Sequence, residues 1–160
     1  MYLKEKGKER GIMMLKKPSE IDYLENYYIA NYTSAIYYKH CILTTKKIFL
    51  KKLFKSLYNH KKALKDDLDR HISEARDQEY LDQLLLKCKK EVFKMQQNLS
   101  INTNPKSGQI CTEMERRFFA QLHQTLQLLT DGSLRNTLLS HRHKSKALQE
   151  KLLLVNKYLI

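Results

Sequence analysis

The feature that most constrains this chain is the absence of helix breakers: no proline or glycine occurs between Ser19 and Asn98. The whole sequence of 160 residues contains only four glycines and two prolines. A β-rich fold needs turn residues at about every 8–12 positions, and this chain does not supply them. Leu, Lys, Glu and Gln are abundant instead, and all four have good helix propensity. We therefore predict an all-α protein, built as an antiparallel helical bundle.

Local signals divide the chain into a basic arm and one helical domain. Residues 1–17 hold six basic and two acidic residues with two glycines, and we expect a flexible basic arm there. Residues 18–160 should form a single domain, with helices near 19–43, 45–97, 113–130 and 133–158 and a loop at 98–111. A chain of this length is able to bury roughly 70% of the surface that it exposes when unfolded.

Candidate capping residues define several of these boundaries. Thr45 could cap the second helix, and Thr112 and Glu115 have the spacing of a capping box. Gly132 suits the left-handed position that ends many helices, and Ser133 can cap the last helix.

Apolar residues recur at alternating intervals of three and four, as in a coiled-coil seam. Two upstream series, from Leu57 through Lys61 to Ala75 and from Leu81 to Leu99, do not share one register. The seam must therefore shift near residues 72–80, by a stutter or a bend, and the sequence leaves open whether residues 20–97 form one bent helix or several. We expect long helices with coiled-coil-like pairing that fold back at 98–111. The seam of the last helix consists of Leu134, Leu138, His141, Ser145, Leu148, Leu152, Val155 and Leu159.

Residues 44–62, TTKKIFLKKLFKSLYNHKK, are the strongest functional lead, with seven lysines and no acidic residue. On a helix, the Leu and Phe side chains share one arc and most of the lysines lie opposite. The lysines of this face are either simply solvated or paired with an anionic partner. Like charges at i,i+4 destabilise a helix, and this cost favours a partner. The predicted anion-binding residues are Lys46, Lys47, Lys51, Lys52, Lys55, Lys61 and Lys62.

An internal partner for these lysines is the alternative. Residues 66–82 carry seven acidic residues, whereas the last helix is basic. Antiparallel pairing across the loop at 98–111 would bring those two segments together. The lysines of 46–62 would then remain without a partner inside the chain, which favours an external one.

Six tyrosines lie within residues 23–38. Their width around a helix suits a helix buried among several neighbours or an intersubunit surface, and stacking on nucleobases is a weaker alternative. The predicted protein-interface residues are Tyr23, Tyr27, Tyr28, Tyr32, Leu138, Leu148, Leu152 and Val155.

No motif in the sequence predicts catalysis or metal binding. His141 and His143 are two residues apart and face nearly opposite ways on a helix, and neither CxxC nor HExxH occurs. The segment NPKSGQ lacks the second glycine and the GK[ST] ending of a phosphate-binding loop. We predict a protein that is not an enzyme, with no catalytic residue, metal or cofactor.

Cysteine usage and hydropathy bear on the compartment. Cys41, Cys88 and Cys111 are odd in number and far apart, which favours a reducing, intracellular environment such as the cytoplasm. The apolar run near the N-terminus has only four residues, too few for a signal-peptide core. No run approaches the length of about 18 apolar residues that spans a bilayer.

The net charge of +13 favours anionic partners without selecting among them. We expect a non-catalytic assembly or adaptor protein that docks an acidic protein surface, in a hetero-complex or a homo-oligomer. The alternative is a nucleic-acid-binding protein that contacts phosphates. Its 23 lysines against seven arginines would favour charge neutralisation over base reading. Binding to a membrane surface is the third alternative, because lysine opposes Phe and Leu on the same helix.

Overall fold

The computed structural model describes residues 18–101 and 107–156, which form five α-helices and no strand. The predicted all-α fold is thereby confirmed. The predicted arm at 1–17 lies outside the described residues, as do 157–160, which include Leu159 of the predicted seam. The helices are α2 (Pro18–Thr44), α3 (Ile48–Ala75), α4 (Gln78–Ile101), α5 (Ser107–Leu128) and α6 (Gly132–Asn156).

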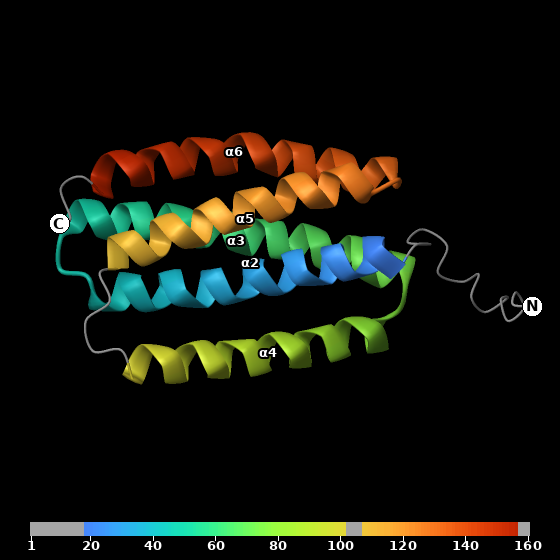
Figure 1. Cartoon of the computed structure of the whole chain (residues 1–160), viewed down its shortest axis with the longest axis horizontal. Helices are drawn as coiled ribbons and strands as arrows, with labels where there is room; N and C mark the ends of the chain where they lie inside the picture. The colour runs from blue at the N-terminus through green and yellow to red at the C-terminus, as the bar shows by residue number, and fades with distance from the viewer. Residues whose placement is uncertain (1–17, 102–106, 157–160) are drawn as a thin grey trace, which may run out of the picture.

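Helices α2, α3, α5 and α6 form a four-helix bundle, and α4 lies along one side of it (Figure 1). Each of α2 and α6 packs against both α3 and α5, and all four of these neighbouring pairs are antiparallel. Helix α4 packs against α2 and α3 only, and it runs parallel to α2. Over the described ranges, α4 does not pack against α5 or α6.

The buried side chains form two clusters along the bundle. In one cluster the rings of Tyr27 and Phe118 stack with their centroids 4.6 Å apart. In the other cluster Tyr38 stacks on Phe54 with the ring centroids 6.3 Å apart. The buried Leu152 of α6 belongs to the same cluster. The seam of α6 supplies side chains to both clusters, and its residues Leu134, Leu138, His141, Ser145, Leu148 and Leu152 are all buried.

The helix predicted at 45–97 is interrupted, because α3 ends at Ala75 and α4 begins at Gln78, so residues 20–97 form several helices and not one bent helix. The break lies within residues 72–80, where the seam was predicted to shift register. Asp77, the residue before α4, caps the helix, because its carboxylate accepts a hydrogen bond from the backbone N–H of Tyr80 at 2.8 Å. An aspartate in that position satisfies one of the unpaired N–H groups of the first helical turn.

The predicted cap of the last helix is also wrong. Asp131, not Ser133, accepts the backbone N–H groups of Ser133 and Leu134, at 2.9 and 3.2 Å. Gly132 is the first residue of α6, and it does not have the left-handed conformation that was expected. A glycine is tolerated there because the aspartate before it carries the capping function.

Two further capping predictions fail for related reasons. The connection at 45–47 confirms the predicted break after Thr44, but Lys47 occupies the N-cap of α3 and makes no side-chain cap hydrogen bond. Helix α5 begins at Ser107, so Thr112 and Glu115 lie inside it instead of forming a capping box. Glu115 is therefore free to turn into the core.

The predicted loop at 98–111 is too long, since α4 continues to Ile101 and α5 begins at Ser107. Residues 102–106 lie outside the described part of the chain. The helices on either side of them do not pair. The expected contact between the acidic segment and the last helix is made by α3 instead, through Asp67 and His141.

Candidate functional site

Six of the seven predicted lysines lie on the surface of the bundle. Five are exposed, and Lys51 is half-buried. None of the six forms an ion pair with another described residue, whereas Lys87 and Lys94 of α4 do. We call this set the lysine face: Lys46 and Lys47 in the connection before α3, with Lys51, Lys52, Lys55 and Lys62 on α3.

Lys61 does not belong to the lysine face, contrary to prediction, because its side chain is fully buried. Its Nζ lies 3.1 Å from Oε2 of Glu115 and 3.2 Å from the centroid of the Phe118 ring. The hydroxyl of Tyr38 also donates a hydrogen bond to Glu115. Burial lowers the pKa of Lys61, and the Glu115 carboxylate partly opposes that shift. This lysine has its anionic partner inside the chain.

The apolar side of α3 is shared between the core and the surface. Ile48 and Phe49, in its first turn, are 71% and 51% exposed, and Leu43 at the end of α2 is 76% exposed. These side chains lie close in sequence to Lys46 and Lys47, so this end of the bundle offers both positive charge and apolar surface. The remaining apolar residues of the stretch are buried in the bundle: Leu50, Leu53, Phe54 and Leu57.

The tyrosines predicted to form an interface are mostly part of the core of this chain. Tyr27 and Tyr28 are buried, and the hydroxyl of Tyr28 donates to Asp69 of α3. Burial and the Asp69 carboxylate together raise the pKa of the Tyr28 phenol. Tyr32 is half-buried, and Tyr23 is 37% exposed. Only Tyr23 therefore presents much of its ring to a partner.

The predicted interface residues of α6 also face inward. Leu138, Leu148 and Leu152 are buried between α6 and the rest of the bundle, and Val155 packs half-buried against the second core cluster. In this structure they hold α6 to its own chain.

Two histidines and an aspartate form a hydrogen-bonded side-chain network between α3 and α6. This network was not identified from the sequence. Nε2 of His141 is 2.7 Å from Oδ2 of Asp67, and its Nδ1 is 3.3 Å from Nε2 of His60. If His141 donates to Asp67, then its Nδ1 accepts the Nε2–H of His60. Burial lowers the pKa of His60 to about 3, and the nearby charges of Lys61 and Lys144 add to the shift.

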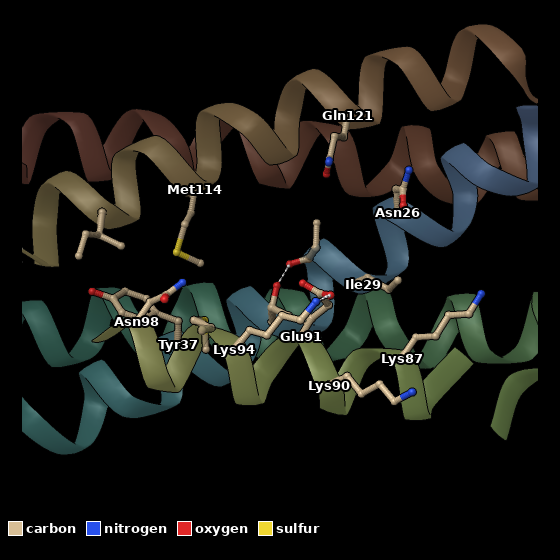
Figure 2. A pocket seen from close by; sticks show the side chains of 14 residues that line it. Asn26, Ile29, Tyr37, Lys87, Lys90, Glu91, Lys94, Asn98, Met114 and Gln121 are labelled. Atoms are coloured by element: carbon tan, nitrogen blue, oxygen red, sulfur yellow. Dashed lines mark hydrogen bonds and ion pairs between the residues drawn. The ribbon is translucent and has the colours of Figure 1, made fainter. Parts of the chain in front are cut away.

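A groove with a volume of about 870 Å³ lies between α4 and α5 (Figure 2). It exists because both helices pack on α2 but not on each other. Its apolar lining comes from all three helices and includes Ile29, Ala30 and Tyr37 of α2, Met95 of α4, and Ile110 and Met114 of α5. No sequence pattern pointed to it, because its walls are far apart along the chain.

Lysines line the α4 side of the groove. Lys87 pairs with Glu25 at 3.1 Å, and Lys94 pairs with Glu91 at 3.3 Å. Lys90 has no ion pair with any described residue. Once these two ion pairs are counted, Lys90 leaves this side of the groove with a net positive charge.

Within the described ranges, no group of three or more His, Cys, Asp or Glu side chains is arranged to hold a metal ion. Nor is any described helix long and apolar enough to cross a membrane. Comparison of the chain with known protein families, curated proteins and solved structures found no match.

Proposed function

We propose that this protein is a non-catalytic helical binding protein whose lysine face docks an acidic surface of a partner protein. The observation that carries the proposal is the set of six surface lysines that pair with no acidic side chain among the described residues. Unpaired like charges on one helix disfavour the folded state slightly, and an anionic partner removes that cost.

The acidic residues of α3 itself are poorly placed to neutralise most of this face. Within α3 they begin at Asp66, eleven residues beyond Lys55, which corresponds to about 16 Å along a helix that rises 1.5 Å per residue. That separation exceeds the screening length of about 8 Å at physiological ionic strength. Two of these acids are also engaged elsewhere, Asp67 with His141 and Asp69 with Lys65.

The composition of the surrounding surface favours a protein partner over a nucleic acid. Ile48 and Phe49 are exposed next to the lysines, and a phosphate backbone offers such side chains no apolar contact. A protein surface that combines carboxylates with apolar groups matches both features. Insertion into a membrane is disfavoured, because the rest of the apolar side of α3 is buried in the bundle.

The test compares two variants with the same change in net charge. The first carries Lys52→Glu, Lys55→Glu and Lys62→Glu on the lysine face, and the control carries Lys144→Glu, Lys146→Glu and Lys151→Glu on α6, where all three residues are also exposed. With the full chain as bait, an acidic protein that is captured by the wild type should remain with the α6 variant and be lost from the lysine-face variant. Circular dichroism would verify that both variants keep their helicity.

Other outcomes would contradict this assignment. Equal loss from both variants would mean that net charge alone drives the capture. A labelled single-stranded oligonucleotide, titrated at about 50 and 200 mM salt, tests the nucleic-acid alternative. Binding that survives the higher salt but fails with the lysine-face variant would replace the protein partner with a nucleic acid.

A further inference from the structure

The groove between α4 and α5 extends along three helices. It is lined by residues 26–37 of α2, 87–98 of α4 and 110–121 of α5. Each range extends over eleven residue steps, or about 16 Å at 1.5 Å per residue, which is about three helical turns. A hollow with this shape, bounded by two helices that do not touch, matches a segment of helix better than it matches a compact small molecule.

The lining of the groove suits the apolar face of such a helix. Ile29, Ala30 and Tyr37 lie on the α2 side, and Met95 and Met114 lie on its two flanks. Figure 2 shows the thioether of Met114 pointing from α5 toward the open space. Methionine side chains adapt to the shape of an apolar partner, since they are flexible and polarizable.

The polar groups around the groove indicate the charge of its occupant. Lys87, Lys90 and Lys94 line the α4 side with one acidic residue, Glu91, and Lys90 lacks an ion pair within the described chain. Across the groove, the amide of Gln121 points into the space (Figure 2), and its Oε1 is buried without a hydrogen-bond partner among the described residues. An occupant with carboxylates toward α4 would complement the lysines.

We propose that this groove binds an amphipathic helix of a partner protein, with the apolar face of that helix on α2 and acidic residues paired with the lysines of α4. The proposal goes beyond the function assigned to the lysine face, because it concerns another surface with a different lining.

The N-terminal segment of the chain is not a suitable occupant. Residues 1–17 contain six basic residues against two acidic ones, so the α4 lysines would repel them. A second copy of the chain is disfavoured for the same reason. Leu86 and Phe93, the exposed apolar residues of α4, stand among lysines, and docking them would bring like charges together.

The test uses three fluorescein-labelled synthetic peptides of about 18 residues, a length of about 27 Å when helical. One places Leu on a single helical face with Glu on its flanks, a second replaces every Glu by Lys, and a third scrambles the first. At about 150 mM salt, the Glu peptide should bind the full-length wild type at least about tenfold more tightly than the scrambled peptide. Amide shifts of the ¹⁵N-labelled protein should concentrate in the groove ranges of α2, α4 and α5.

Point variants separate the groove from a general effect of charge. Lys90→Glu should weaken binding of the Glu peptide about threefold, whereas Lys89→Glu on the same helix but outside the groove lining should change it less than about 1.5-fold. The Lys peptide should instead bind the Lys90→Glu variant more tightly than it binds the wild type. Thr33→Trp, which places bulk in the groove, should reduce binding of the Glu peptide at least about tenfold.

Several results would overturn the proposal. These are equal binding of the Glu and scrambled peptides, equal effects of Lys90→Glu and Lys89→Glu, or a change in solution mass caused by Thr33→Trp, which would identify a second copy as the occupant. If Thr33→Trp disturbs the helical content, the lysine variants alone decide. Amide shifts confined to α3 would reject the groove while leaving the proposed function of the lysine face intact.

Discussion

At the scale of single residues, Lys61 is the most unusual, because the fold buries this charged side chain away from water. Its ammonium contacts Glu115 and the face of Phe118, and the hydroxyl of Tyr38 satisfies a second acceptor site on the carboxylate. Desolvation of two charges offsets most of their mutual attraction, so the pair itself adds little stability. Removing one partner, however, leaves the other charge buried and uncompensated.

We therefore expect strong coupling between these two residues. Glu115→Leu should reduce the free energy of unfolding by about 3–5 kcal/mol, because it leaves the ammonium of Lys61 buried and unpaired. The double replacement Lys61→Met with Glu115→Leu should lose less than Glu115→Leu alone, and its remaining loss of about 1–3 kcal/mol should come from the orphaned hydroxyl of Tyr38. Urea denaturation of the wild type, both single variants and the double variant measures this coupling. Additive losses would contradict it.

The sequence contained a signal for this residue, which the charge pattern obscured. Lys61 occupies a seam position in the apolar series that runs through Leu57 and Leu64, and both of these neighbours are buried. Its charge and its position beside Lys62 suggested the surface instead. The partner could not be identified from spacing, because Glu115 is 54 residues away on another helix and looked like half of a capping box.

At the scale of elements, α4 differs from the other helices in how it is held. Among residues 18–101 and 107–156 it packs on α2 and α3 only, and Leu86 and Phe93 remain 57% and 60% exposed. The apolar series from Leu81 correctly indicated which side of α4 turns inward, and Leu81 and Cys88 are buried. Periodicity defines an apolar side but not the helix that covers it, so the wrong pairing across 98–111 could not be corrected from sequence.

Helix α4 should open separately from the four-helix bundle. Native-state hydrogen exchange should give amides of residues 84–95 an opening free energy at least about 2 kcal/mol below that of the α3 core, because local stability follows local packing. Leu84→Ala should lower the opening free energy of α4 and that of global unfolding equally, since Leu84 is buried in the native packing of α4. Leu122→Ala in α5 should lower only the global value, and equal exchange throughout the bundle would contradict separate opening.

At the scale of the whole molecule, composition was sufficient for the fold class and for the sign of the surface charge. The scarcity of glycine and proline indicated an all-α chain, and most of the lysines of 44–62 do lie outside. The groove could not be predicted, since it depends on the packing of three helices that are far apart in the sequence and leave a gap between two of them. The contact between His60 and His141 has the same origin: it joins residues 81 apart through the packing of α3 on α6.

The burial of His60 should make the stability of the molecule depend on pH. His60 titrates near pH 6.5 in the unfolded chain, but burial lowers its pKa to about 3 in the folded one. Between these values the unfolded state binds one more proton, so the free energy of unfolding decreases as the pH falls. The expected loss from this residue is about 1.4 kcal/mol per pH unit once the pH is well below 6.5, and about 1.7 kcal/mol between pH 6.5 and 5.

Urea denaturation between pH 7 and 5 would test this dependence without strongly titrating the carboxylates. His60→Gln should remove most of the slope, because the amide keeps a donor for His141 but cannot take up a proton. His143→Gln, on the exposed face of α6, should keep the slope of the wild type. The groups that face His60 are Lys61 beside it and His141 and Lys144 on α6, with Asp67 beyond His141. If His60→Gln retained the wild-type slope, one of these neighbours, not His60, would be the group that couples protonation to unfolding.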